Sequence, residues 1–267
     1  MKEINLVHFI EWKKIPDNEL DATMKALSSI GANNIVLHPE WAKRNQAGRG
    51  YLKMIGAKMK NFGISSTATH GLWGNEFDLR CPDEERRKEI VRAHREFIEI
   101  SAAMGSLTYT VHLGDDQAGQ TRQEMQGRAR KCIDELLPVA ENTGTKIAME
   151  NMISYDHSEY LAALAAEYDN PSLGLCLDTG HAHVKEGLKK AVDNMAPYLV
   201  TCHMHDNDGN GDQHYPPTRG SIDWKYLVPT LKACPKILNA ETEAGSCEDL
   251  SISANWELFE NTWAESK

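Results

Sequence analysis

The stretch Ser172-Leu-Gly-Leu-Cys-Leu-Asp178-Thr-Gly-His181-Ala-His183 contains the pattern that decides the fold. Its first part, residues 173–178, is a short apolar run, which is typical of a strand buried on both faces of a parallel sheet. The run ends on Asp178, and His181 follows in the next turn. A buried strand that ends on ionisable side chains predicts one βα unit with its chemistry at the carboxyl end of the strand.

Seven more short apolar runs occur along the chain. They cover residues 4–9, 34–37, 64–69, 107–112, 146–150, 199–203 and 237–241. The longer segments with the periodicity of amphipathic helices are residues 20–30, 83–104, 123–140, 158–168, 223–233 and 248–264. Eight alternating βα units predict an α/β fold of the (β/α)8 TIM barrel type. Because no Pro-, Gly- or Ser-rich linker divides the chain, we expect residues 1–267 to form a single domain.

Length and charge limit the classes of function. The chain has 267 residues, an ordinary length for a barrel of ~250 residues. Its 29 Lys and Arg against 39 Asp and Glu give a formal net charge of −10, which disfavours a nucleic-acid backbone as partner. No apolar stretch approaches the ~20 residues of a membrane span, and residues 1–20 lack the features of a signal peptide. We therefore expect a cytoplasmic protein that binds neither nucleic acid nor membrane.

The cysteines show no pattern of a metal or redox site. None of the six forms a C-x-x-C pair, which argues against a zinc-thiolate knuckle or a redox dithiol. Cys176 and Cys202 lie within apolar runs, where a thiol usually behaves as a small hydrophobic group. We expect all six, including Cys247, to be reduced structural residues.

Ionisable side chains collect at the ends of the predicted strands, where the catalytic groups of such barrels lie. They are His8, His38, His70, His112, Glu150, Asp178, His203 and Glu241. Each alone has a structural explanation: Asp178 could cap the next helix, and a buried glutamate could form an ion pair with Arg or Lys. Eight such groups at one barrel mouth favour a functional site.

The types of these side chains suit a divalent cation, which binds carboxylate oxygen and imidazole nitrogen. The segment Cys202-His-Met-His-Asp-Asn-Asp208, with Asp212-Gln-His214 shortly after it, reads as a ligand cluster, although it could be a polar turn rich in Asx residues. The irregular piece at residues 207–221 is long for a compact barrel, and such loops are more often functional than idle. Glu150 and Glu241 end buried strands, which is costly unless they are paired or bound to metal.

Seven motifs, taken in order, resemble the xylose isomerase-like barrel superfamily, which joins sugar (phosphate) isomerases and epimerases with endonuclease IV-type enzymes. They are HGLW (70–73), VHLG (111–114), AMEN (148–151), CLDTGHAH (176–183), CHMHDND (202–208), DQH (212–214) and ETE (241–243). In the epimerases two Glu, one Asp and one His hold a single divalent metal, often Mn. The resemblance therefore implies Glu150, Asp178, His203 and Glu241 as metal ligands and His181 as a substrate contact.

The endonuclease IV branch of the same superfamily holds three zinc ions. Residues that match its further ligands are also present here: His70, His112, His181, Asp212 and His214. The acidic charge balance favours the sugar branch, and so does His205, because the endonucleases have Asn at that position. Both branches lead us to expect a Gly-Glu-Gly or Gly-Lys-Gly turn, where this chain has Thr218-Arg-Gly220. Arg219 could reach an anionic group of the substrate or lie on the surface.

Together these patterns predict a metal-dependent isomerase or epimerase of a sugar or sugar phosphate. It would work through an enediolate, with proton transfer by Glu150 and Glu241. The expected cofactor is a divalent ion, Mn first, with Zn, Co or Mg as alternatives. The residues expected to bind substrate are His181, His70, His112, Arg219 and Trp73. Three alternatives stay open: a zinc endonuclease at abasic DNA, a dehydratase or lyase of a hydroxy acid, and a metal-free sugar-binding barrel; a homo-oligomer is compatible with all of them.

Overall fold

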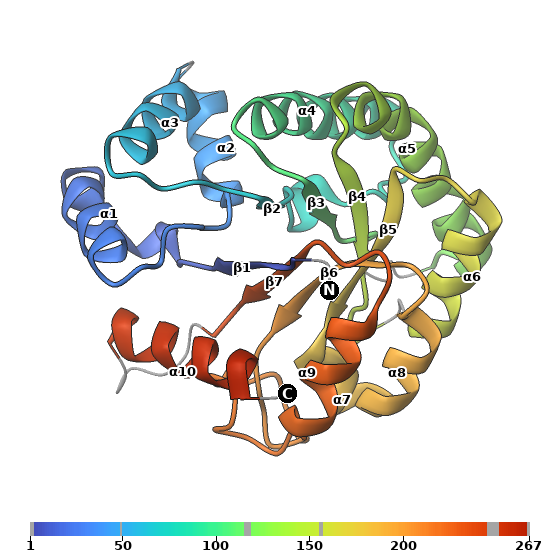
Figure 1. The fold of residues 1–267 in the computed structure, drawn as a ribbon. Helices are drawn as coiled ribbons and strands as arrows, with labels where there is room; N and C mark the ends of the chain where they lie inside the picture. The colour runs from blue at the N-terminus through green and yellow to red at the C-terminus, as the bar shows by residue number, and fades with distance from the viewer. Residues whose placement is uncertain (1–2, 49, 115–118, 155–156, 245–250, 266–267) are drawn as a thin grey trace.

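The computed structural model describes residues 3–48, 50–114, 119–154, 157–244 and 251–265, which form a nearly closed barrel of parallel strands (Figure 1). Seven strands pair in the order β1-β7-β6-β5-β4-β3-β2. They are β1 (Asn5–His8), β2 (Ala68–His70), β3 (Thr108–Val111), β4 (Lys146–Glu150), β5 (Leu173–Asp178), β6 (Leu199–Met204) and β7 (Asn239–Thr242). The α/β barrel that the repeated βα pattern predicts is confirmed.

The eighth expected strand, at residues 34–37, is not a regular strand. It lies between β1 and β2 and joins them through isolated parallel bridges that pair His8 with Ile35, Asn34 with Ser65, and Leu37 with Thr69. Backbone hydrogen bonds run to both neighbours, for example from His8 N to Asn34 O and from Leu37 N to Ala68 O. The Asn34 side chain adds to them: its Nδ2 donates to Leu6 O, and its Oδ1 accepts from Thr67 N. The barrel is therefore closed at this point by bridges and side-chain hydrogen bonds, which apolar patterning does not predict.

Helices form the outer layer around the strands (Figure 1). The α-helices of the described residues are α1 (Leu20–Ser29), α2 (Pro39–Ala47), α3 (Tyr51–Asn61), α4 (Glu84–Ala103), α5 (Arg122–Thr143), α6 (Ser158–Tyr168), α7 (Thr179–Lys185), α8 (Leu188–Met195), α9 (Trp224–Ala233) and α10 (Ile252–Glu265). The sequence predicted six of them. It missed α2, α3, α7 and α8. With 7 and 8 residues, α7 and α8 are short enough for tertiary packing rather than helix propensity to decide them. The expected start of the last helix at residue 248 lies outside the described residues.

The described residues include five of the six cysteines. Cys81, Cys132, Cys176, Cys202 and Cys234 are free, and Cys247 lies outside the described residues. No helix within the described ranges is both long enough and apolar enough to cross a membrane.

Candidate metal centre and pocket

A cavity of about 380 Å³ opens at the carboxyl ends of the strands. This volume is in the usual range of small-molecule sites. Its wall is formed by Phe9, Glu11, Lys14, His38, His70, Trp73, His112, Glu150, Met152, His181, Asp212, His214 and Glu243. Of the residues singled out from the sequence, His38, His70, Trp73, His112, Glu150, His181, Asp212 and His214 therefore reach one cavity.

Two of the singled-out residues lie away from this cavity. Arg219 is exposed on the loop between β6 and α9 and is not among the described residues that line the cavity. His8 is buried against Trp256 of α10, with ring centroids 5.1 Å apart, because the neighbouring Val7 takes the position inside the barrel. Alternation along the strand therefore turns His8 outward.

Three of the four expected metal ligands lie beneath the cavity wall. Asp178, His203 and Glu241 are almost completely buried and do not line the cavity, whereas Glu150 does. Glu241 accepts a hydrogen bond from the hydroxyl of Thr201 on β6. Burial raises the pKa of Glu241 to about 7, although His203 opposes this shift. A carboxyl group at this depth is protonated more readily than one at the cavity surface.

Glu243, two residues after Glu241, lies at the cavity, where the sequence led us to expect Glu241. Residues i and i+2 of a strand point to the same face, and the barrel strands are tilted, so each step of two residues moves a side chain upward along the barrel axis. Glu243 therefore lies above Glu241 and lines the cavity. His205 likewise follows His203 by two residues, just beyond the end of β6, and is fully buried beside Asp178 without lining the cavity. The sequence contains the signal for both in its E-x-E and H-x-H doublets, of which the family resemblance implied only the first members, Glu241 and His203, as metal ligands.

The floor of the cavity is a carboxylate–imidazole–carboxylate arrangement. Nδ1 of His203 lies 3.4 Å from Glu150 Oε2 and 3.1 Å from Glu243 Oε2. Nε2 of His70 lies 4.0 Å from one oxygen of each of these carboxylates. His112 donates to Glu150 Oε2 from Nε2, at 3.1 Å. Glu150 and Glu243 thus lie beside the same two imidazoles, those of His70 and His203.

Burial and ion pairs together set the pKa values of the side chains at the floor of the cavity. Burial by itself would raise the pKa of Glu150, but His203 and His112 hold it well below its usual range. The pKa of Glu243 is likewise lowered by His203 against the effect of burial. Burial would lower the pKa of His203, and the neighbouring Cys176, Glu243 and Glu150 raise it well above its usual value. Both glutamates are therefore carboxylates at neutral pH.

Asp178 has a structural and a site role at the same time. Its Oδ1 accepts from the backbone N–H of His181 at 2.7 Å, so Asp178 is the N-cap of α7. Its two oxygens also lie 2.9 and 3.0 Å from Nε2 of His205. The capping explanation and the ligand explanation are thus compatible, because one carboxylate has enough lone pairs for both.

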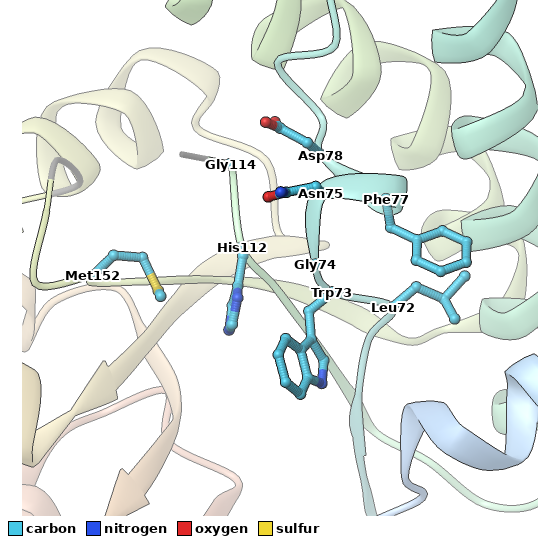
Figure 2. Close-up of a pocket in the computed structure, with 9 residues that line it drawn as sticks. All are labelled: Leu72, Trp73, Gly74, Asn75, Phe77, Asp78, His112, Gly114 and Met152. Carbon is cyan, nitrogen blue, oxygen red and sulfur yellow. The ribbon is translucent and has the colours of Figure 1, made fainter. Parts of the chain in front are cut away.

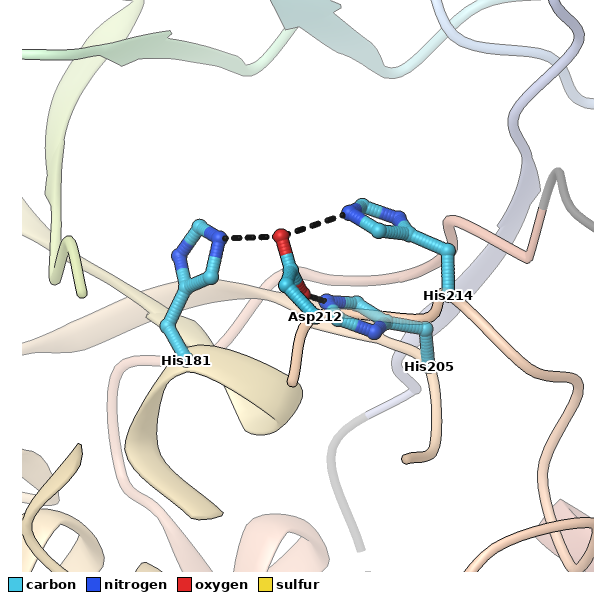
Figure 3. Close-up of side chains that lie close together, drawn as sticks. All are labelled: His181, His205, Asp212 and His214. Carbon is cyan, nitrogen blue, oxygen red and sulfur yellow. Dashed lines mark hydrogen bonds and ion pairs between the residues drawn. The ribbon is translucent and has the colours of Figure 1, made fainter. Parts of the chain in front are cut away.

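A second group of ligand atoms lies at the cavity wall, above α7 (Figure 3). Asp212 Oδ2 lies 3.3 Å from His181 Nε2 and 3.1 Å from His214 Nε2. The rings of His205 and His214 stack with centroids 3.9 Å apart. Burial opposes the charged form of His181, but Asp178 and Asp212 raise its pKa to about 10. The long loop thus brings Asp212 and His214 to His205, just after β6, and to His181 of α7.

The spacing of these atoms fits a metal ion. Donor atoms bound to one divalent ion at 2.0–2.2 Å lie about 3 Å apart. Four groups of side chains have one ligand atom each within 4.8 Å of the others: His181, His205, Asp212 and His214; His70, Glu150 and His203; Glu150, Asp178 and His181; and Asp178, His205 and Glu243. Glu241 is in none of these groups. The donor chemistry is mixed oxygen and nitrogen, which suits Mn, Zn or Co.

The loop that carries Asp212 and His214 is held by one buried carboxylate. Asp206 pairs with Tyr215 through two backbone hydrogen bonds. Its side chain accepts from the backbone N–H of Asn207, the backbone N–H of Ile222 and the indole N–H of Trp224. Gly220 has to be a glycine here, because a Cβ would lie 2.3 Å from Asp206 Oδ1.

We expect Asp206→Ala to destabilise the protein by about 1–3 kcal/mol, because it leaves buried donors without an acceptor. Asp208→Ala, in the same loop but at an exposed position, should change stability by less than about 0.5 kcal/mol. Urea denaturation of the two variants and the wild type measures the difference. Equal stability of both variants would contradict the anchoring role of Asp206.

Aromatic and apolar side chains form the opposite wall. Figure 2 shows the adjoining smaller cavity, where Met152 and Trp73 lie on either side of His112. The rings of Trp73 and His112 are 6.4 Å apart, and Trp73 is 47% exposed. An indole face left open at a cavity is a surface on which the C–H face of a polyol can pack.

Comparison with known proteins agrees with this architecture. The family model described as "Xylose isomerase-like TIM barrel" matches residues 20–257. The chain belongs to the xylose isomerase-like TIM barrel family. The resemblance inferred from the seven motifs is therefore confirmed.

Several curated members of this family are similar in sequence. An uncharacterized protein of Methanocaldococcus jannaschii, MJ1311, is 27% identical over 160 residues, 56% of this chain and 55% of that protein. Fructoselysine 3-epimerase of Shigella flexneri is 26% identical over 164 residues, 58% of each chain. A probable endonuclease 4 of Carboxydothermus hydrogenoformans is 26% identical over 205 residues, 65% of this chain and 69% of that protein. The chain spans about half the length of the first curated relatives it matches.

Solved structures of the family share the whole barrel. A D-tagatose 3-epimerase-like protein has a TM-score of 0.78 at 18% identity, covering 98% of both chains. The IOLI protein with a binding zinc atom has a TM-score of 0.78 at 16% identity, also over 98% of both chains. At these identities the similarity establishes the fold.

Proposed function

We propose that this chain is a divalent-metal-dependent epimerase or isomerase of a sugar or a related polyhydroxy carbonyl compound. The observation that carries the proposal is the pair of carboxylates Glu150 and Glu243, 2% and 12% exposed. They line one cavity from the end of β4 and from just after β7, beside the same imidazole of His203. Two ionised bases at one cavity suit removal of a proton from a substrate carbon and its return to another face or a neighbouring carbon. The sugar epimerases among the similar proteins support this class of reaction.

The proposed metal site consists of Glu150, Asp178, His205 and Glu243. It keeps the composition that the family resemblance implies, two Glu, one Asp and one His, but uses the second member of each doublet instead of His203 and Glu241. The spacing among Asp178, His205 and Glu243, and that between Glu150 and Asp178, supports this choice. A bound Mn²⁺, or alternatively Zn²⁺, Co²⁺ or Mg²⁺, would supply Lewis-acid polarisation of the substrate carbonyl.

The chain's own groups would do the remaining chemistry. One of the carboxylates Glu150 and Glu243, which both border the cavity, takes the proton from carbon and later releases it to water. The other delivers a proton that it has first taken up from water in the cavity. His181 presents an N–H to a substrate oxygen from a position between Asp178 and Asp212. His112 orients Glu150 through its hydrogen bond, and Trp73 covers one face of the substrate. Arg219 has no part in this proposal because it is exposed away from the cavity.

Asp178→Asn tests the metal site with little change of shape. Asparagine is as good an N-cap as aspartate, so α7 should keep its first turn, while the charge that a cation needs is lost. We expect the variant to lose most of its bound metal and, with it, the stabilisation that the ion gives to the folded state. Elemental analysis and thermal unfolding measure both effects. Unchanged metal content would remove Asp178 from the site.

The wild-type, metal-loaded protein tests the proposed reaction. Incubation of metal-loaded protein with a panel of ketoses in D2O should place deuterium at the carbon beside the carbonyl of one of them, with an epimer or isomer as product. Release of water to give a dehydrated product would instead identify a dehydratase.

An endonuclease acting at abasic DNA is the second candidate, because His181, His205, Asp212 and His214 form a further group of ligand atoms within 4.8 Å. We expect no meaningful nicking of abasic DNA, since a net charge of −10 gives little attraction to a phosphate backbone. A gel assay with an abasic oligonucleotide and zinc-loaded protein measures this. Efficient cleavage that His112→Ala abolishes, with about three zinc ions per chain, would favour the endonuclease.

A further inference from the structure

One wall of the cavity takes no part in the metal centre. Glu11 and His38 line it from the loop after β1 and from the start of α2. Nε2 of His38 lies 3.6 Å from Glu11 Oε1, which is too long for a hydrogen bond between them. The cavity therefore has a donor and an acceptor side by side that do not satisfy each other.

The tautomer of His38 is fixed by the backbone. His38 is the N-cap of α2, and its Nδ1 accepts from the backbone N–H of Glu40 at 3.1 Å. Burial lowers the pKa of His38 to about 3, so the ring is neutral at pH 7. A neutral imidazole that accepts at Nδ1 carries its proton on Nε2. His38 is thus a permanent N–H donor beside the carboxylate of Glu11.

Packing holds the two groups in place from behind. Trp12 follows Glu11 in the chain, and Trp41 lies one helical turn after His38. These two indoles are fully buried and pack together with centroids 4.6 Å apart. Phe9 lies over the other side of His38, at 5.2 Å between ring centroids, and continues to His70 at 6.3 Å. His38 is therefore preorganised, and the buried Trp12 holds the backbone of Glu11 beside it, while the Glu11 side chain itself is 40% exposed. Phe9 and His70 lie between this pair and the metal centre.

We propose that Glu11 and His38 form a subsite for a free hydroxyl group at the end of the substrate remote from the metal centre. The inference rests on the proposed function, and it narrows the substrate class to sugars that are not phosphorylated or oxidised at that end.

The chemistry of the pair selects a hydroxyl over the other end groups of sugars. A hydroxyl can accept from His38 Nε2 and donate to the Glu11 carboxylate at once. A carbonyl or methyl group lacks the proton that Glu11 needs. A phosphate or a carboxylate would place a like charge against Glu11, which is unfavourable at a partly desolvated site. Lys14, three residues after Glu11, also lines the cavity and offsets part of this repulsion, but it is more exposed than Glu11, so water screens its charge more strongly.

The test compares binding of matched sugars by isothermal titration calorimetry with the full, metal-loaded chain. The probe is whichever of D-fructose, D-tagatose and D-psicose binds most tightly, together with its 6-deoxy and 6-phosphate derivatives. We expect the parent sugar to bind roughly 5- to 100-fold more tightly than either derivative, as for loss of one hydrogen bond to a buried or charged partner.

Two variants connect this preference to the pair. Glu11→Ala should weaken binding of the parent sugar and strengthen binding of its 6-phosphate. The ratio of the two affinities should therefore fall about tenfold or more. His38→Asn should weaken binding of the parent sugar alone, because asparagine still caps α2 but has no N–H at the position of Nε2. Glu19→Ala, at an exposed position before α1, is the control and should bind like the wild type.

Thermal unfolding shows whether each variant is folded. Tighter binding of the 6-phosphate by the wild type, a preference unchanged in both variants, or no binding of any of the three sugars would overturn the subsite. Solvent-deuterium exchange is recorded separately. Selective binding without exchange would leave the subsite standing and reject the proposed epimerase.

Discussion

Replacing Glu243 with glutamine should reduce turnover by about 10²–10⁴-fold, the usual contribution of a positioned proton-transfer group. Glutamine keeps the shape of the side chain but cannot take a proton from carbon. Glu150→Gln should have an effect of the same size. Glu241→Gln should stay within about tenfold of the wild type, because the Glu241 side chain is buried beneath the cavity and hydrogen-bonded to Thr201.

Solvent-hydrogen exchange with a turned-over sugar, measured at saturating metal, is the appropriate assay for this series. The metal content of each variant has to be determined beside it, since Glu150 and Glu243 are also proposed ligands. Strong loss of exchange in Glu241→Gln, with near-normal exchange in Glu243→Gln, would restore the assignment expected from the sequence. Near-normal exchange in both Glu150→Gln and Glu243→Gln, with metal retained, would reject the two-glutamate mechanism.

Gly180→Ala should abolish tight metal binding without changing any charged residue. Gly180 lies in the first turn of α7, and a Cβ there would be 2.0 Å from Cε1 and 2.5 Å from Nδ1 of His205. The imidazole of His205 would have to rotate away from Asp178, with which it makes contacts of 2.9 and 3.0 Å. Overpacking of this kind costs typically about 1–3 kcal/mol, in addition to the lost ligand.

The matched control is Gly127→Ala in α5. Gly127 is also a helical glycine, but a Cβ there meets nothing within 4 Å. Alanine should be neutral at that position or stabilise the helix by up to about 1 kcal/mol. Elemental analysis and thermal unfolding of the two variants separate steric displacement of His205 from general effects of the substitution. Full metal occupancy in Gly180→Ala would show that His205 is not a ligand and would favour His203.

The repeated apolar runs were sufficient to predict the architecture. The runs at residues 146–150 and 173–178 coincide with β4 and β5, and the helical periodicity at residues 158–168 coincides with α6. These elements are buried on both sides or on one broad face, so their patterns are strong. The segment at residues 34–37 was expected to be a strand and instead pairs with both neighbours through isolated bridges, to which the Asn34 side chain adds hydrogen bonds. Local apolar character cannot distinguish a regular strand from a segment that pairs through isolated bridges.

The sequence predicts which types of residue form the site, but not how high along the barrel axis each side chain lies. Imidazoles and carboxylates at the ends of successive strands are evident from the sequence, and parallel strands bring their carboxyl ends to one mouth. The doublets His203/His205 and Glu241/Glu243, which span the ends of β6 and β7, are evident there too. That Glu243, rather than Glu241, borders the cavity follows from the folded barrel alone. The period of two in a strand puts both glutamates on the inner face, whereas their height along the barrel axis depends on the tilt and stagger of all the strands, which no single segment encodes.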